Sequence, residues 1–300
     1  MISAAVRTRF TTICILTPGV CILVVTVLIL SGRGNAQAAS AIQRHIAYSY
    51  TLQNESGETI KDAQFRTYAP VKQTPTQKCT RIAASHPYKT ITDKAGNRIL
   101  QFDFQEFPAY AVKIVTIEAD LLLSKEPAKE KGKDLTAYLK AERFIEKDAP
   151  AVRKKAKELA AKGSLQTARS IARWIPENVK YSGYTGADYG ALWALSQRQG
   201  DCTEYMYLFA ALCRANSIPA RCLEGYICEE SIVLKPGMFH SWAEFHHDGA
   251  WRVADPSNRK FMQDQHNYIV MRIFRVSQGD PETDFHRLHF IGKGLKVTMN

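Results

Sequence analysis

The 300-residue sequence lacks the patterns of several large protein classes. It has no internal repeat and no low-complexity segment, which excludes a repeat architecture. Gly292-Lys293-Gly294 does not have the spacing of a phosphate-binding loop. No arginine-aromatic cluster suggests nucleic-acid readout, so no nucleic-acid partner is expected.

Metal-ligand patterns are equally scarce. Cys222 and Cys228 lack a zinc-ligand spacing. The histidine candidates are His246-His247-Asp248 and the pair His286 and His289. A His-x-x-His pair alone is a weak signal and a turn histidine is usually solvated. We therefore expect no metal and no cofactor.

The N-terminus resembles a targeting segment. Arg7 and Arg9 precede an apolar run over residues 13–30, and Ala36-Gln37-Ala38 fits a small-x-small cleavage site. The pattern predicts a signal peptide over residues 1–38; the alternative is an uncleaved membrane anchor. The prediction is a periplasmic or secreted protein with no stable membrane span once the signal is removed.

Removal of this segment changes the charge and the cysteine count. It holds three basic residues and no acidic one, which leaves a net charge of +8 from the +11 of the whole chain. Such a surplus suits an anionic cell-envelope surface, although the basic residues at 125–162 alternate with Glu as on a solvated helical face. Five cysteines remain, an odd number that leaves at least one thiol unpaired. A pairing of Cys213 with Cys222, or one that involves Cys79, stays open.

The patterns divide the rest of the chain into three parts. Residues 39–123 show short alternating strands with a turn at 93–97, which predicts a β-sandwich domain. Residues 124–134 are rich in Lys, Glu and Pro and predict a linker. Residues 135–300 form the third part. There, helical periodicity covers 135–142, 149–161, 164–178, 190–198 and 202–216, with Ser164 as an N-cap, and strands follow from 221 to 273.

Three residues of the third part can together perform nucleophilic catalysis. Cys202 follows Gly200 and Asp201, a tight turn and a helix cap that place its sulfur in the first helical turn. Backbone N–H groups there favour a thiolate and can hold an oxyanion. His240 opens a strand and Asp255 closes the next one. The three predict a thiol nucleophile, its base and the group that orients the base.

The hairpin between His240 and Asp255 tests this idea. If strands 240–246 and 251–255 pair around a turn centred on Asp248-Gly249, paired positions sum to 497. Asp255 then lies opposite Trp242, and His240 is its diagonal neighbour on the same face. A loop of different parity would separate the two side chains.

These segments resemble the transglutaminase-like superfamily over residues 135–258. The resemblance is carried by the Gly-x-Cys helix start, the run from Ala211 to Arg221, His240-Ser241-Trp242-Ala243-Glu244 and Asp255-Pro256-Ser257. It implies an α+β papain-like core in which Cys202 is the nucleophile, His240 the general base and acid, and Asp255 the orienter of His240. A preceding sandwich is similar to that of exported bacterial members. The calcium loops of the animal enzymes are not recognisable, so calcium dependence is not carried over.

The resemblance implies thiol-dependent acyl transfer on an amide of a protein or peptide substrate, including one associated with the cell envelope. The outcome is hydrolysis, as in a peptidase or amidase, or transamidation of a glutamine, with a slight preference for hydrolysis. Tyr181, Trp193 and Gln197 are candidates for the second oxyanion donor. The alternative function is a non-catalytic module that binds peptide or cell-envelope polymer.

Overall fold

The computed structural model describes residues 41–130, 132–184, 186–274 and 285–300. The predicted signal peptide, residues 1–38, lies outside the described residues. Residues Ala39–Asn300 form one compact unit. Within the described ranges, no helix is both long and apolar enough to cross a membrane.

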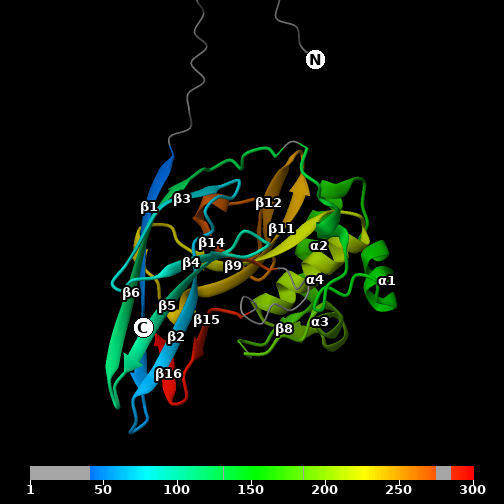
Figure 1. The fold of residues 1–300 in the computed structure, drawn as a ribbon. Coiled ribbons are helices and arrows are strands. Elements are labelled where there is room, and N and C mark those ends of the chain that lie inside the picture. The colour runs from blue at the N-terminus through cyan, green and yellow to red at the C-terminus, as the bar shows by residue number, and fades with distance from the viewer. Residues whose placement is uncertain (1–40, 131, 185, 275–284) are drawn as a thin grey trace, which may run out of the picture. The chain divides into compact units, whose positions relative to one another are not determined.

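Two sheets pack face to face as the predicted β-sandwich (Figure 1). The first sheet has the order β10-β1-β6-β3, and β16 also pairs with β1. Its strands are β1 (Ile42–Asn54), β3 (Gln77–Ala84), β6 (Val112–Leu123), β10 (Ile232–Val233) and β16 (Leu295–Met299). The second has the order β15-β2-β5-β4 and consists of β2 (Ile60–Ala69), β4 (Lys89–Thr92), β5 (Arg98–Phe107) and β15 (Leu288–Ile291). Alternate residues of β1, from Ile46 to Leu52, are buried in one core with residues of β2, β5 and β6, which explains the alternation in the sequence.

The predicted boundary at residue 123 does not match the strand pairing. Three short strands from beyond it complete the sandwich: β10 lies parallel to β1, β16 antiparallel to β1, and β15 antiparallel to β2. The sandwich core also takes in Tyr226, Ile269 and Met271. Because these partners are distant in sequence, no local pattern assigns the tail to the sandwich. Residues 39–123 are therefore not a self-contained sandwich.

The rest of the chain is built on a five-stranded antiparallel sheet in the order β13-β12-β11-β9-β14. Its strands are β9 (Ala220–Ile227), β11 (Phe239–His247), β12 (Ala250–Asp255), β13 (Lys260–Phe261) and β14 (Tyr268–Phe274). The side chain of Gln77 in the sandwich bonds both the N–H and the carbonyl of Val270, at 2.9 and 3.1 Å. The two sets of sheets are thus joined through buried polar contacts as well as through a common core.

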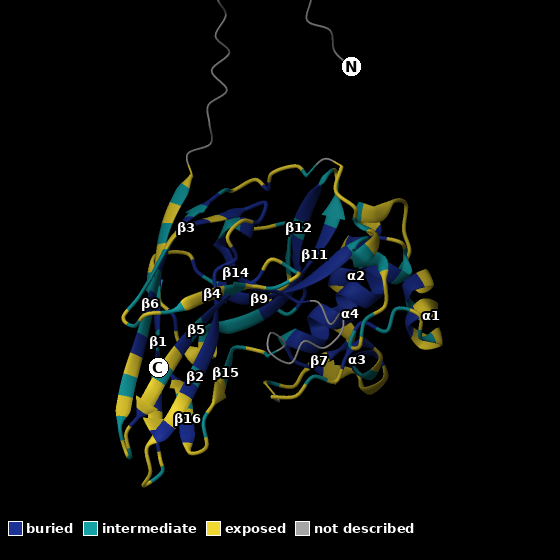
Figure 2. Cartoon of the chain, viewed as in Figure 1, coloured by how far each residue is buried: buried dark blue, intermediate teal, exposed yellow. Residues whose placement is uncertain are grey.

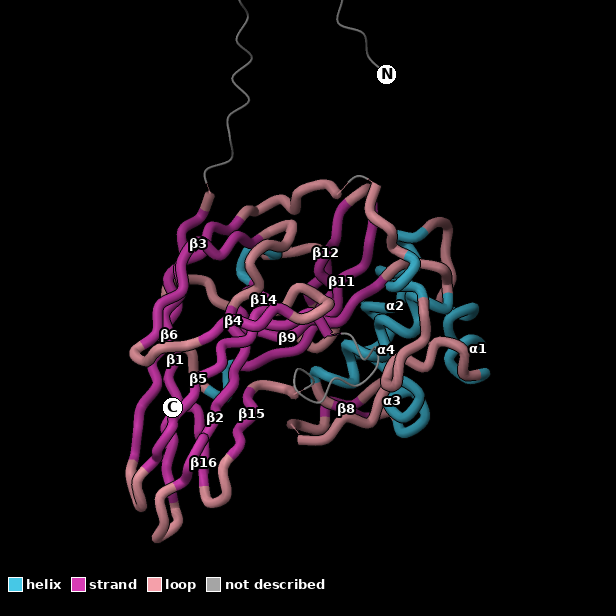
Figure 3. The backbone as a smooth tube through the Cα atoms, in the orientation of Figure 1, coloured by secondary structure: helices cyan, strands magenta, loops and turns pink. Residues whose placement is uncertain are grey.

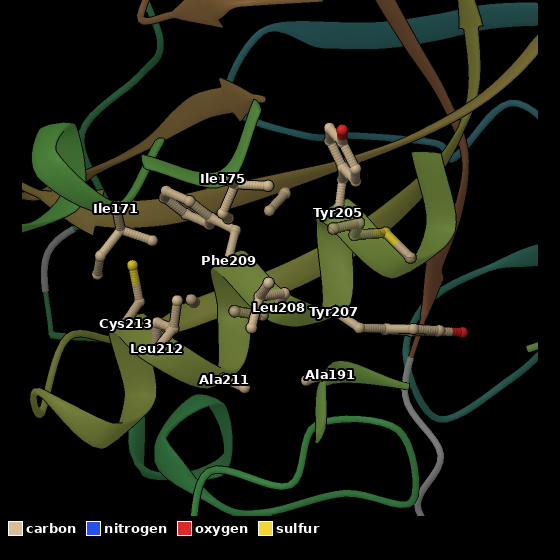
Figure 4. Close-up of a cluster of buried hydrophobic side chains, with 14 of the residues drawn as sticks. Ile171, Ile175, Ala191, Tyr205, Tyr207, Leu208, Phe209, Ala211, Leu212 and Cys213 are labelled. Atoms are coloured by element: carbon tan, nitrogen blue, oxygen red, sulfur yellow. The ribbon is translucent and has the colours of Figure 1, made fainter. Parts of the chain in front are cut away.

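Four helices gather on one side of this sheet (Figure 3). They are α1 (Pro150–Glu158), α2 (Ser164–Asn178), α3 (Ala191–Gln197) and α4 (Cys202–Ala215). Figure 2 shows that α4 is buried almost along its full length, and Figure 4 shows its Phe209 and Leu212 packed beside Ile171 and Ile175 of α2. A central helix that is apolar on all sides is typical of a buried one. The sequence therefore contains a helix that can hold its first residue, Cys202, in a fixed position.

Two helix predictions need correction. Residues 135–142 contain only the short 3-10 turn Thr136–Leu139, none of whose residues is buried, so no buried face stabilises a longer helix there. The N-cap of α2 is Gly163 and not Ser164; its φ of 84° is a conformation that favours glycine. Two other 3-10 turns, Pro236–Met238 and Gln265–Asn267, and the two-residue strands β7 (Lys180–Tyr181) and β8 (Gln199–Gly200) complete the described elements.

Candidate active site

The start of α4 is held by a reciprocal pair of hydrogen bonds. The carboxylate of Asp201 accepts a bond from the Thr203 N–H at 2.8 Å, and the Glu204 carboxylate accepts one from the Asp201 N–H at 3.1 Å. This is a capping box, in which two otherwise unpaired N–H groups are satisfied. A Cβ atom on Gly200 would lie 2.5 Å from the Cβ of Glu204, so only glycine fits there. The half-buried thiol of Cys202 therefore sits at a well-defined helix N-terminus.

The hairpin has the predicted register. Ala243 pairs with Ala254, Phe245 with Arg252 and His247 with Ala250, all of which sum to 497. His240 Nε2 lies 2.8 Å from the Asp255 Oδ2, so the diagonal contact forms.

Asp255 is completely buried and has five hydrogen-bond contacts. Its Oδ2 accepts bonds from the Tyr268 hydroxyl at 2.9 Å and Asn258 Nδ2 at 2.8 Å, in addition to the contact with His240. Its Oδ1 accepts bonds from Ser257 Oγ at 2.8 Å and the Asn258 N–H at 3.3 Å. Burial opposes ionisation, but the hydrogen bonds with His240, Asn258 and Ser257 outweigh it and lower the pKa of Asp255. A buried, charged carboxylate thus fixes the imidazole ring.

The Cys202 thiol lies close enough to His240 to act on its pKa. Since Nε2 faces Asp255, Nδ1 is the ring nitrogen left for the sulfur. Burial alone lowers the pKa of His240, yet the hydrogen bond with Asp255 and the nearby Cys202 prevail and raise it to about 9. The structure therefore brings together all three residues predicted from the sequence, in the order sulfur, imidazole, carboxylate.

Tyr181 is a further contact of Cys202. The parallel pairing of β7 and β8 places Tyr181 beside Gly200, close enough to Cys202 for the two residues to act on each other electrostatically. Burial raises the pKa of Tyr181 to about 12, and the nearby Cys202 and Asp201 add to the effect. No contact in the described part of the chain links the other two candidates, Trp193 and Gln197, to Cys202. Trp193 instead stacks on Tyr189, with ring centres 4.3 Å apart.

A second ionic cluster lies beside Cys202. Side chains of this cluster and Cys202 line one narrow pocket. The buried Glu224 pairs with Arg272 at 3.1 Å and with His286 Nδ1 at 3.3 Å, and His286 Nε2 pairs with Asp188 at 2.9 Å. Hydrogen bonds to Asp188 and Glu224 raise the pKa of His286 to about 10. This role of His286 was not predicted, since its two partners, Asp188 and Glu224, come from segments distant in the sequence. Among the residues described, no group of three His, Cys, Asp or Glu side chains is placed so that it could hold a metal ion.

The cysteines of the described part are all unpaired. Cys213 and Cys222 are buried, and burial raises the pKa of both thiols. They are packing residues, whereas Cys202 is the partly accessible one.

Residues 153–256 match the family model of the transglutaminase-like superfamily. The match runs from α1 to the residue after Asp255 and includes Cys202 and His240. The chain therefore carries a transglutaminase-like domain. A search of curated proteins found no match.

The fold has counterparts among solved structures. The crystal structure of a cysteine protease candidate from Cytophaga hutchinsonii superposes with a TM-score of 0.57 at 18% identity, over 87% of this chain and 92% of that one. This likeness extends the common fold across the sandwich as well as the transglutaminase-like domain. The periplasmic domain of TgpA from Pseudomonas aeruginosa (TM-score 0.35, 16% identity, 69% and 90% of the chains) and red sea bream transglutaminase (0.29, 12%, 74% and 49%) score too low to extend that argument.

Proposed function

We propose that the protein is a cysteine-dependent enzyme that transfers the acyl group of an amide through a thioester on Cys202. The observation that carries the proposal is the chain of contacts from the Cys202 thiol through His240 to the buried Asp255. The match to the transglutaminase-like superfamily supports it, because the three residues lie within the matched segment.

The contacts support a complete proton cycle. With the proton of the thiol held by His240, the Cys202 thiolate attacks the amide carbonyl and forms a C–S bond. His240 then donates its proton to the leaving nitrogen as the C–N bond breaks. A water or an amine next attacks the thioester and gives its proton to His240, and the C–S bond breaks to restore Cys202. Asp255 keeps the imidazole oriented and balances its positive charge throughout.

Two donors can hold the oxyanion of the tetrahedral intermediate. One is the backbone N–H of Cys202 at the start of α4, and the other is the hydroxyl of the nearby Tyr181.

We propose hydrolysis of a polypeptide amide as the reaction outcome, in a compartment outside the cytoplasm. Water is the abundant acceptor, and the pocket beside Cys202 is narrow and lined by Phe239, His286 and Arg287. The sequence pattern of residues 1–38 supports export.

The test is product analysis on a glutamine-containing peptide, with and without added primary amine. We expect hydrolysed product by mass spectrometry with the wild type in both cases and none with Cys202→Ala. If an amine adduct is the main product, the reaction is transamidation and not hydrolysis. Equal product from Cys202→Ala and wild type would overturn the mechanism, and binding without turnover would favour the non-catalytic module.

A further inference from the structure

An open pocket of about 510 Å³ lies between the outer face of α2 and the turn that follows Asp255. Its volume is within the range of ligand-binding pockets. The lining side chains come from two segments and include Gln166, Arg169, Arg173 and Pro176 of α2, and Arg259, Lys260, Phe261 and Gln263. None of these residues belongs to the proposed catalytic machinery.

The pocket lining is strongly basic and has no acidic residue. Lys260 pairs with Asp264 at 2.8 Å, and the Arg169 guanidinium lies 4.7 Å from the centre of the Phe261 ring. Over the ranges that the structure describes, no carboxylate lies within ion-pair distance of Arg169, Arg173 or Arg259. Three guanidinium groups therefore surround this pocket without an acidic partner; we call them the arginine triplet.

The stability of α2 does not explain why two of these arginines lie side by side. Arg169 and Arg173 are exposed and four residues apart on α2, where like charges lie side by side and destabilise a helix. The inner face of α2 packs through other residues, among them Ile171 and Ile175. A basic cluster that weakens its own helix is consistent with a role in binding.

One side of the pocket is connected to the proposed active site. Arg259 directly follows Asn258, whose Nδ2 is 3.1 Å from His240 Nε2. Its charge also acts on Tyr205, whose ring packs edge-on against Tyr181 at 5.9 Å. The turn that carries Arg259 therefore contacts His240 through Asn258.

We infer that the arginine triplet binds the carboxylate of an acidic residue in the polypeptide substrate. Guanidinium groups bind carboxylates through paired, charge-assisted hydrogen bonds. The remaining lining favours a peptide over a bare polyanion, because Phe261 and Pro176 offer apolar surface and Gln166 and Gln263 offer amide groups. What happens to the bound peptide rests on the proposed function, but the binding itself does not.

The test is fluorescence anisotropy with the whole chain carrying Cys202→Ala. The probes are two fluorescein-labelled peptides with one central Gln, one flanked by Glu residues and the other by Gln residues. We expect the acidic peptide to bind about tenfold tighter, with an advantage that shrinks as salt is added. Arg169→Gln with Arg173→Gln should abolish this advantage. The matched control is Arg153→Gln with Lys157→Gln, which removes two exposed charges at the same spacing on α1 and should keep it.

Equal binding of the two peptides, or an unchanged preference in the Arg169→Gln, Arg173→Gln variant, would overturn the inference. So would tight, triplet-dependent binding of polyphosphate without any preference between the peptides. Because Cys202 is absent from the assay, a lack of turnover by the wild type would count against the proposed function alone.

Discussion

His240 and His286 both lie near Cys202 and differ in what they can do. Each pairs with a fully buried carboxylate, Asp255 for His240 and Glu224 for His286, and each has a raised pKa. The second nitrogen of His286 is taken by Asp188, however, whereas His240 has the thiol of Cys202 beside it. A histidine held between two carboxylates is a fixed charge; one held between a carboxylate and a thiol can move a proton.

The carboxylates differ in the same way. Asp255 is surrounded by neutral donors, including Tyr268 and Ser257, so His240 is its only charged contact in the described structure. Glu224 already has the charge of Arg272 beside it. The comparison shows that a buried carboxylate and a raised histidine pKa do not define a catalytic pair without a nucleophile in contact.

The largest expected difference concerns the two histidines. His240→Ala should lower kcat/KM by about a thousandfold or more, because both the base and the acid are lost. His286→Ala should change it by less than about tenfold. Steady-state kinetics of the two purified variants makes this comparison, and an equal loss in both would remove the distinction between the two histidines.

Substitutions of the two carboxylates should have different effects, one on activity and the other on stability. Asp255→Asn should lower kcat by about a hundredfold to ten-thousandfold, because Asn can no longer balance the charge of His240. Glu224→Gln should instead destabilise the fold by about 3 kcal/mol, since it removes a buried carboxylate that pairs with both Arg272 and His286. Urea unfolding and kcat should be measured on the same preparations. A loss of activity in Glu224→Gln without a loss of stability would contradict this pattern.

The pH dependence of stability gives a smaller effect. The pKa of His240 rises from 6.5 to about 9 on folding, so its contribution is full below about pH 6.5 and is lost as the pH rises through 9. For a side chain only 14% exposed, this contribution is about 3 kcal/mol at most. His240→Asn should therefore reduce the fall in the free energy of unfolding between pH 6.5 and 9, part of which remains because the pKa of His286 is raised to about 10. His286→Asn removes only this second part and serves as the control. An unchanged slope in His240→Asn would contradict the ion pair.

Local sequence patterns were sufficient to predict the elements that carry Cys202 and His240. Gly200 and Asp201 mark the start of α4, and the Asp248-Gly249 turn determines the register that brings His240 to Asp255. Each signal lies within a few residues of the feature it predicts. This is why α4 and the hairpin could be predicted without any knowledge of tertiary structure.

Contacts between distant segments could not be predicted in this way. Tyr268 of β14 contacts Asp255 of β12, and His286 contacts Glu224 of β9, so both contacts depend on how separate segments are arranged in the fold. The boundary at residue 123 failed for the same reason, because β16 finds its partner β1 about 240 residues earlier in the chain. Among the three candidates for the second oxyanion donor, Tyr181 is distinguished from Trp193 only by the pairing of β7 with β8.

The most direct test is the rate of Cys202 alkylation by iodoacetamide as a function of pH, followed by peptide mass spectrometry. It needs no substrate. We predict that reactivity persists below about pH 7 in the wild type and in His286→Ala, and that His240→Ala loses it. A rate that rises only in the alkaline range, as for any free thiol, and that is the same in wild type and His240→Ala, would contradict the thiolate–imidazolium pair.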